Sequence, residues 1–237
     1  MQSRGEKSYI NMPAFAARLY DNLTSVRGVS TSFKEIASFL ETIVETGCLL
    51  DVGTGPGHLL AEINRKLPRL NLYGFDISAS MLQVAEENLQ HIEHIDLRLG
   101  NIVRTEYQDD FFDSIVSSGS FYNWDKPVEG LDEIFRILKP GRMAYIFETY
   151  KDFNRESLEA GLESNLREYS FFRRKVSEFF LLRQLSMTYT LSEFDGIIKR
   201  SRFSESFNLR KIALGNLPVY VRIELKKVHT AKPSGQL

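Results

Sequence analysis

The chain has 237 residues and 43% of them are apolar, so it can bury the core of one α/β domain. Its 30 basic and 31 acidic side chains leave a formal net charge of −1, which argues against binding of a long nucleic acid. The one cysteine, Cys48, excludes an internal disulfide and a cysteine-built metal site. No apolar run approaches the roughly 20 residues that span a bilayer, and the first ten residues lack the apolar run of a signal peptide. We therefore expect a cytoplasmic protein without a membrane, nucleic-acid or metal partner.

Strand-like and helix-like patterns alternate through the middle of the chain. Short apolar runs that stop at glycine, proline or aspartate predict five strands, and periodic apolar positions between them predict helices. Such a β-α-β order favours a parallel sheet with right-handed crossovers. The predicted elements are, in chain order, a strand at 48–52, a helix at 59–67, a strand at 72–75, a helix capped by Ser78 (with Asp76 and Ser80 as alternatives), strands at 95–99 and 114–117, a helix lined by Leu131, Ile134, Phe135 and Leu138, and a strand at 143–147 after a Pro140-Gly141 turn.

Two regions flank this core. Residues 13–44 predict two helices before the first strand, and residues 154–183 predict a long helical stretch after the fifth. A helix at 191–200 precedes two late strands, 207–214 and 219–225, whose four-residue connection suits an antiparallel hairpin. We expect one domain, made of N-terminal helices (1–46), a cofactor-binding core (47–150), a helical lid (151–190), a last helix with the hairpin (191–226) and a frayed tail that begins at about Lys227 (227–237).

The strongest motif is the glycine-rich turn at residues 49–57, LLDVGTGPG. Glycine stands at every second position, 53, 55 and 57, where a buried strand meets a helix. Glycine permits the sharp turn and lets a ligand approach the backbone closely, and the free N–H groups at the helix start can bind a carboxylate. The turn predicts a cofactor site at the carboxyl end of the first strand. The alternative is a plain strand-to-helix turn.

The spacing of these glycines distinguishes between two kinds of cofactor. Dinucleotide folds use G-x-G-x-x-G, whereas this chain has G-x-G-x-G, with His58 where the third glycine should be. Asp51 precedes the first glycine, and its carboxylate would repel a pyrophosphate but suits a ligand with an ammonium and a sulfonium group. Asp76, at the end of the second strand, can accept hydrogen bonds from two ribose hydroxyls.

Three segments together resemble the class I S-adenosylmethionine-dependent methyltransferases of the small-molecule, methyltransferase-domain type. They are LLDVGTGPGHLL at 49–60, YGFDIS at 73–78 and LKPG at 138–141. The resemblance covers about residues 20–225 and matches least at 154–190. It implies a Rossmann-like three-layer sandwich with a seven-stranded, mostly parallel sheet. The implied strand order is 3-2-1-4-5-7-6 with the seventh strand antiparallel, which the late hairpin fits.

The resemblance also implies the parts of a cofactor site. In the family the glycine turn wraps the methionine part, Asp76 would hold the ribose, and Ile77 would pack on adenine. A Gly-Asp pair usually reaches the adenine amine, but this chain has Gly100-Asn101-Ile102, and the Asn101 side-chain oxygen can still accept from that amine. Arg18-Leu19-Tyr20-Asp21 resembles an N-terminal helix that closes over the cofactor, although a plain amphipathic helix is an equal alternative. The predicted cofactor-binding set is Tyr20, Asp51, Gly53, Thr54, Gly55, Gly57, Asp76, Ile77, Met81, Asn101, Ile102, Ser117 and Ser118.

The segment after the fourth strand, SSGSFYNW at 117–124, is expected to face the methyl acceptor. It lacks the proline pair of the DNA amino-methyltransferases, so DNA is not the expected substrate. Tyr122, Asn123 and Trp124 are candidate substrate residues, while Phe121 and Trp124 could equally be core aromatics. His58 could act as a base, but packing or exposure is the more common role of such a histidine.

We therefore predict a methyltransferase that moves a methyl group from S-adenosylmethionine to a small molecule by in-line displacement. Alignment of the two reactants supplies much of such a rate enhancement, so no particular catalytic residue is predicted. The alternatives are a non-catalytic protein that binds S-adenosylmethionine and, less favoured, a nicotinamide oxidoreductase. The apolar residues of the 154–183 region predict an apolar or aromatic acceptor, plain core packing or a homodimer contact.

Overall fold

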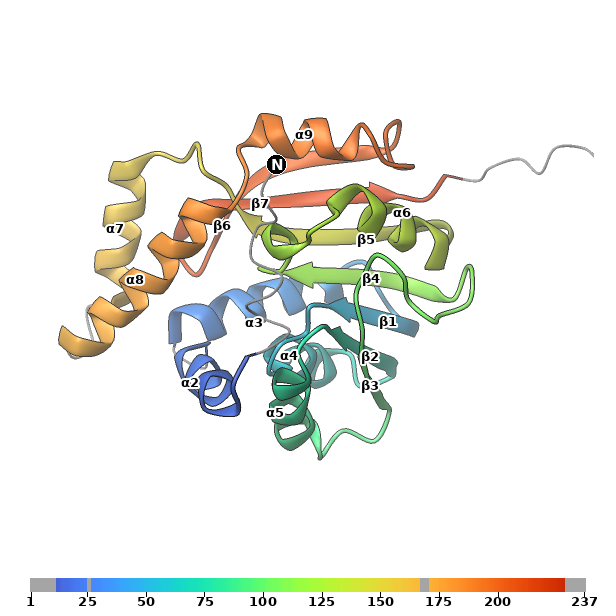
Figure 1. Ribbon diagram of the computed structural model, residues 1–237, viewed down its shortest axis with the longest axis horizontal. Coiled ribbons are helices and arrows are strands. Elements are labelled where there is room, and N and C mark those ends of the chain that lie inside the picture. The colour runs from blue at the N-terminus through green and yellow to red at the C-terminus, as the bar shows by residue number, and fades with distance from the viewer. Residues whose placement is uncertain (1–11, 25–26, 167–170, 229–237) are drawn as a thin grey trace, which may run out of the picture.

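A computed structural model describes residues 12–24, 27–166 and 171–228, with most of their side chains. Its seven-stranded sheet has the order β3-β2-β1-β4-β5-β7-β6 (Figure 1). Strands β1 to β5 run parallel, and β7 runs antiparallel to both of its neighbours, so the predicted fold class and strand order are confirmed. The strands are β1 (Gly47–Val52), β2 (Leu70–Asp76), β3 (Ile95–Leu99), β4 (Phe112–Ser118), β5 (Leu138–Thr149), β6 (Phe207–Leu214) and β7 (Leu217–Lys226).

Helices cover both faces of the sheet and make the predicted third layer (Figure 1). On one face α6 and α9 pack through side chains such as Leu131 and Phe194. On the other, α3, α4 and α5 pack through Ile36, Leu60 and Leu89. With both faces covered, a ligand can approach the sheet at the carboxyl ends of its strands. The helical segments are α2 (Ala14–Thr24), α3 (Arg27–Glu41), α4 (His58–Lys66), α5 (Ala79–Leu89), the 3-10 helix η1 (Phe121–Asn123), α6 (Pro127–Ile137), α7 (Arg155–Leu166), α8 (Phe171–Met187) and α9 (Leu191–Ile198).

Local sequence signals explain most of these boundaries, but the start of β5 differs from the prediction. Ser78, one of the three candidate caps, is the N-cap of α5, and its Oγ accepts from the Met81 N–H at 3.4 Å. Leu138, expected on the face of α6, instead begins β5 and pairs with Phe112. Pro140-Gly141 lies inside β5, because Gly141 with φ of 79° allows a bulge and the strand continues beyond it.

The last strands also correct two predictions. The hairpin connection has two residues, Gly215 and Asn216, with φ of 54° and 61°, so Leu217 already belongs to β7. Lys227 does not begin a frayed tail. Its side chain is 7% exposed, and its ammonium group contacts the Asp110 carboxylate. Residues 229–237 lie outside the described part of the chain.

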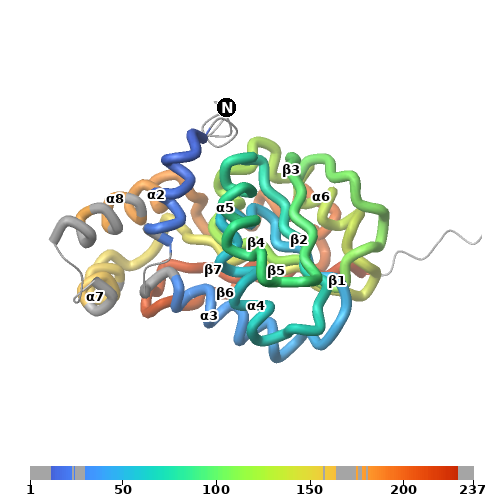
Figure 2. The backbone as a smooth tube through the Cα atoms, turned by 90° about the horizontal axis from the view of Figure 1, so that it is seen from below, coloured from blue at the N-terminus to red at the C-terminus, as the bar shows by residue number. Residues whose placement is uncertain are grey.

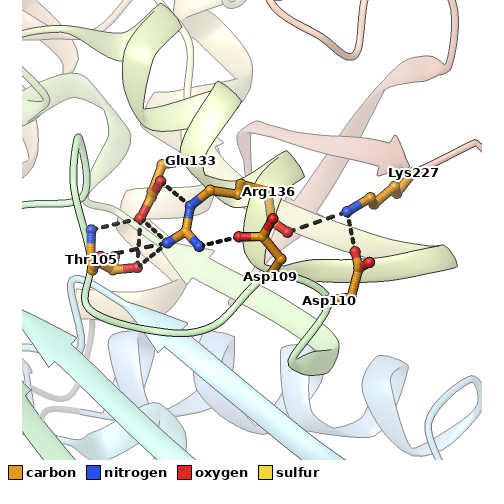
Figure 3. A network of polar contacts seen from close by, with 6 residues as sticks. All are labelled: Thr105, Asp109, Asp110, Glu133, Arg136 and Lys227. Atoms are coloured by element: carbon orange, nitrogen blue, oxygen red, sulfur yellow. Dashed lines mark hydrogen bonds and ion pairs between the residues drawn. The ribbon is translucent and has the colours of Figure 1, made fainter. Parts of the chain in front are cut away.

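A network of polar contacts ties the segment between β3 and β4 to helix α6 and to Lys227 after β7 (Figure 3). The Arg136 guanidinium lies 2.7 Å from Glu133 and 2.6 Å from Asp109. Glu133 also accepts from the N–H and the hydroxyl of Thr105, at 2.6 and 2.7 Å. Lys227 joins the network by donating to the Arg136 carbonyl oxygen at 3.2 Å. These contacts lie at the end of the sheet opposite the carboxyl ends of the parallel strands.

The predicted helical region after β5 consists of two helices, α7 and α8, at the carboxyl end of the sheet (Figures 1 and 2). Two hydrogen bonds anchor the end of α8 to the end of β5. The Thr188 hydroxyl donates to the Thr149 carbonyl oxygen, and the Lys151 N–H donates to the Tyr189 carbonyl oxygen. Phe179 and Leu182 of α8 are exposed, whereas Leu158, Leu185 and Val219 form a small core. Of the other predicted apolar positions, Tyr169 and the side chains of Leu166, Phe171, Phe172, Val176 and Phe180 lie outside the described residues.

Within the described ranges, no helix combines the length and apolar character needed to cross a membrane. The same part of the chain contains no group of three or more histidine, cysteine or acidic residues placed to hold a metal ion.

Candidate active site

A cavity of about 800 Å³, including space open to solvent, lies at the carboxyl ends of β1, β2 and β4. The position is where the order of the parallel strands reverses and where open α/β sheets bind their ligands. The lining residues are Tyr20, Val52, Gly53, Gly55, Phe75, Asp76, Ile77, Met81, Gly100, Asn101, Ile102, Ser118, Gly119, Ser120, Tyr122, Asn123, Trp124 and Asp125.

The glycine turn after β1 forms one wall of this cavity. Gly53 has φ of 75°, and a Cβ there would lie 2.3 Å from the Ser120 side chain, so the two loops pack in direct contact. Gly55 has φ of 53°, yet a Cβ on it would meet nothing within 4 Å. Open space therefore adjoins the backbone at Gly55, as the motif predicts for a turn that a ligand approaches.

Asp76, the last residue of β2, has its carboxylate fixed by two backbone donors. The Gly55 N–H donates to Oδ2 at 2.8 Å, and the Ser78 N–H donates to Oδ1 at 2.9 Å. Burial raises the pKa of this carboxyl group, and the backbone N–H groups of Ser78, Gly55 and Ile77 oppose that rise. Each oxygen retains capacity for a further hydrogen bond, so the carboxylate can accept two ligand hydroxyls from inside the cavity.

Asp51 lies beneath the glycine turn and is 2% exposed. It borders a smaller adjoining cavity together with Thr54 and His58. The pKa of the Asp51 carboxyl group is raised to about 7, mainly by burial; Thr54 opposes the rise and the nearby charge of Asp76 adds to it. A cationic group bound in the smaller cavity would favour the ionised carboxylate.

The loop after β3 forms the far wall of the main cavity. Gly100 packs so tightly that a Cβ would lie 2.6 Å from the Phe75 ring. Asn101 and Ile102 line the space there, opposite Met81. The Asn101 Oδ1 accepts from the Val103 N–H at 3.1 Å, and its second lone pair can accept from a ligand amine.

The loop after β4 is tied to β1 through the Ser120 hydroxyl. Ser120 donates to the Val52 carbonyl oxygen at 3.0 Å, accepts from the Trp124 indole N–H at 3.3 Å, and lies 2.7 Å from the Ser117 hydroxyl. Because its one proton is directed to Val52, Ser117 is the donor in the last contact. Ser120 thereby fixes Trp124 relative to the glycine turn.

The structure separates the aromatic residues of this loop into two groups. Phe121 is fully buried and contacts the rings of Trp124, Tyr189 and Phe194. It is a core residue, as the alternative interpretation held. Trp124 and Tyr122 belong to the same core and also line the cavity. Asn123 lines the cavity beside them.

A second buried carboxylate, Glu148 near the end of β5, lies beside this loop. It is fully buried and accepts from the Thr149 N–H at 2.9 Å, the Gln184 amide of α8 at 3.2 Å and the Tyr122 N–H at 3.4 Å. Burial raises the pKa of Glu148 to about 7 despite these bonds. The contacts therefore link α8 to the cavity through one acidic side chain.

Fourteen of the sixteen predicted site residues line one or both cavities. The exceptions are Gly57, which is the N-cap of α4 and packs against Leu89, and Ser117, which is fully buried beneath Ser120. The sequence prediction missed Ser120 and Glu148. The position of Glu148 at the end of the fifth parallel strand was the available signal, because all such ends meet at one edge. The lining residues that the predicted set lacks are Val52, Phe75, Gly100, Gly119, Ser120 and Asp125 in the main cavity, and Thr24, Phe33, Pro56, His58 and Leu59 in the smaller one. Of these, His58 is a possible base in the sequence prediction, and Gly119 and Ser120 lie in the segment expected to face the acceptor.

The sheet order, the glycine turn and the acid at the end of β2 together define a nucleotide-type cofactor site of the Rossmann-like class. Residues 50–146 match the family model described as "Methyltransferase domain". Over residues 50–146 the core of this chain is therefore similar to the methyltransferase domain of class I enzymes that use S-adenosylmethionine.

Relatives support the same assignment. The chain is 30% identical over 98 residues to the uncharacterized methyltransferase YdaC of Bacillus subtilis, covering 41% of this chain and 54% of the relative. It is 29% identical over 154 residues to the ubiquinone/menaquinone biosynthesis C-methyltransferase UbiE of Geotalea daltonii, covering 62% and 65%. The matches thus span about one half to two thirds of these relatives.

Solved structures share the fold along nearly the whole chain. The plantazolicin methyltransferase BpumL, in complex with a triazolic desmethylPZN analogue and SAH, has a TM-score of 0.70 and 20% identity over 94% of this chain and 95% of its own. A methyltransferase structure from Methanococcus maripaludis has a TM-score of 0.66 and 22% identity over 92% and 94%.

Proposed function

We propose that this protein transfers a methyl group from S-adenosylmethionine to a small-molecule acceptor. The observation that carries the proposal is one cavity lined by two kinds of residue. The glycine turn and the Asp76 carboxylate line it, and so do the polar and aromatic side chains of Tyr122, Asn123 and Trp124. A cofactor and an acceptor can therefore meet inside one site.

The residues present fit this cofactor, because the space beside Gly55 is open and the Asp76 carboxylate is already oriented by two N–H donors. In this proposal Asp76 binds the ribose hydroxyls, Asp51 faces the ammonium group, and Ile77 packs on adenine. When bound, S-adenosylmethionine supplies a methyl group that its sulfonium already activates. The protein contributes binding, an in-line alignment and exclusion of water.

The acceptor in this proposal is an apolar or aromatic small molecule. One support is that the aromatic residues Tyr122 and Trp124 line the cavity. The other is that similar proteins are named as a ubiquinone/menaquinone biosynthesis C-methyltransferase and a plantazolicin methyltransferase. We further propose that α7 and α8 act as a lid over the acceptor, since Gln184 of α8 lies close to Gly119 in the cavity wall. A cytoplasmic location and a homodimer remain predictions from the sequence.

Calorimetry with S-adenosylhomocysteine and, in parallel, NADH tests the cofactor assignment. Saturable binding of S-adenosylhomocysteine and no binding of NADH is the expected result. Transfer of labelled methyl from S-adenosylmethionine to a panel of quinols, phenols and heteroaromatic amines then tests catalysis. Tight cofactor binding without turnover on any acceptor would favour the non-catalytic alternative.

A further inference from the structure

Helix α2 lies against α5 (Figure 2). Its Ala17 is fully buried and packs with Met81 and Val84 of α5. Tyr20, one turn further along, borders both the main cavity and the smaller one next to Asp51. The helix therefore places one aromatic side chain across the boundary between the two cavities.

The residue after Tyr20 holds α2 to the glycine turn. The Asn88 side-chain amide donates to Asp21 Oδ1 at 2.9 Å and to the Pro56 carbonyl oxygen at 3.0 Å. Asn88 thus joins α2 directly to the loop that forms the cofactor wall. This bond links positions 67 residues apart in the chain.

His58, the first residue of α4, makes the second contact with Asp21. Its Nε2 lies 3.0 Å from Asp21 Oδ1, and both side chains are less than a quarter exposed. Among the described residues this nitrogen has no hydrogen-bond partner of good geometry, so its contact with Asp21 is a close polar approach. Asp21 is therefore held from two sides, by α5 and by the start of α4.

A second link between α2 and α5 provides a comparison. Arg18 and Glu87 form an ion pair at 2.8 Å, but their side chains are 57% and 47% exposed. Solvent screens such a pair, and exposed pairs contribute little to stability. Neither residue lines either cavity.

We propose that Asp21 is a positioning residue that, through its contacts with His58 and Asn88, keeps Tyr20 over the bound cofactor and slows release of the product S-adenosylhomocysteine. This inference rests on the proposed function. Asp21 does not line either cavity, so it acts through Tyr20. Loss of its contacts frees α2 from the glycine turn, and the effect falls mainly on the dissociation rate.

Stopped-flow release of S-adenosylhomocysteine tests the proposal. Trp124, the single tryptophan of the chain, lines the cavity and can report occupancy by its fluorescence. We expect Asp21→Ala to speed release by about tenfold, and Asp21→Asn, which can still accept from Asn88, by roughly threefold. Glu87→Ala is the matched control on the same pair of helices and should change the rate by less than about twofold.

A double-mutant cycle separates positioning from general stability. In a Tyr20→Ala background, Asp21→Ala should accelerate release little further, because the residue that it positions is gone. The same acceleration in both backgrounds, or wild-type release from Asp21→Ala and Asp21→Asn, overturns the inference while leaving cofactor binding intact. Absence of any S-adenosylhomocysteine binding to the wild-type protein overturns the proposed function itself.

Discussion

The buried and half-buried carboxyl groups at the two ends of the sheet have pKa values shifted in opposite directions. At the amino end, burial alone would raise the pKa of Glu133, but hydrogen bonds from Arg136 and Thr105 bring it below its ordinary value. Burial would also raise the pKa of Asp113, but its hydrogen bonds from Lys139 and the Cys48 N–H, with the charges of Lys139 and Arg142, together bring it below its ordinary value. These acids are ionised in the folded protein and stabilise it through their cationic partners.

At the carboxyl end, the buried acids lack such partners among the described contacts. Burial raises the pKa of Asp51 and Glu148 to about 7 and also raises that of Asp76. Their hydrogen-bond donors are backbone N–H groups and neutral side chains. In the absence of a ligand, the ionised forms of Asp51, Asp76 and Glu148 therefore reduce the stability of the fold.

This difference distinguishes structural acids from acids available to a ligand. A buried charge without a counterion costs free energy, and such groups cluster at functional sites. A ligand with an ammonium group and ribose hydroxyls would satisfy the acids of the carboxyl end. Substitutions at the carboxyl end should therefore change binding, and those at the amino end should change stability.

The largest expected effect is the loss of cofactor binding in Asp76→Ala. The variant loses two hydrogen bonds to a charged acceptor, worth about 3–6 kcal/mol together, which should nearly abolish S-adenosylhomocysteine binding in calorimetry. Asp96→Ala on β3 is the control, because Asp96 pairs with the partly exposed Arg98 outside the cavity. Wild-type affinity in Asp76→Ala would remove Asp76 from the site.

At the amino end, Arg136→Ala should destabilise the fold. Glu133 is 9% exposed and would lose its cationic partner, at a cost of about 2–4 kcal/mol in denaturant unfolding at neutral pH. The folded pKa of Glu133 is lowered, so this contribution is present above its ordinary pKa of 4.5 and is lost as the pH falls through the folded value. S-adenosylhomocysteine affinity should be unchanged, and a large loss of affinity would contradict the division between the two ends.

Asp51 and Glu148, which lack a cationic partner among the described contacts, should give the opposite pH dependence of stability. Asp51 and Glu148 have folded pKa values of about 7, above their ordinary 3.8 and 4.5, so their stabilising contribution is present at low pH and is lost as pH rises through 7. Asp51→Asn and Glu148→Gln should each raise unliganded stability at alkaline pH, on the order of 1–2 kcal/mol. The gain should shrink as the pH is lowered toward 5.

The pH dependence of ligand binding provides an independent test of the direction of the Asp51 pKa shift. S-adenosylhomocysteine should bind the wild-type protein more tightly above pH 7, where Asp51 is ionised and can face the ammonium group. In Asp51→Asn this dependence should be absent, and Glu148→Gln should retain it. Equal pH profiles in all three proteins would mean that Asp51 does not face the ligand.

Most of the fold could be predicted because its signals are local. The strand at 95–99 was predicted at its observed bounds, and the glycine turn and the Ser78 cap identified where β1 and β2 end. Since parallel strands end at one edge, Asp76 and the loop after β4 could be expected near each other before any coordinates were known.

The remaining features depend on contacts between distant residues. Lys227 looked like the start of a tail, but it is fixed by Asp110, 117 positions earlier. Gln184 contacts Glu148, 36 positions earlier, so no local pattern could assign Gln184 to the site. The Pro140-Gly141 signal was interpreted as a turn before the fifth strand, but the pairing of Leu138 and Met143 with β4 places it inside β5 as a bulge.

The smallest expected effect comes from a solvent-exposed ion pair. It tests whether burial is the reason that the network at the amino end contributes to stability. Lys199 and Asp195 lie four residues apart on α9, 2.8 Å from each other, with side chains 61% and 39% exposed. Lys199→Ala should lower stability by only about 0.3–0.5 kcal/mol. The difference should disappear near 1 M salt, where the Debye length falls to about 3 Å, whereas most of the Arg136→Ala loss should persist. A Lys199→Ala loss as large as that of Arg136→Ala would show that charge pairing alone, without burial, separates the two ends of the sheet.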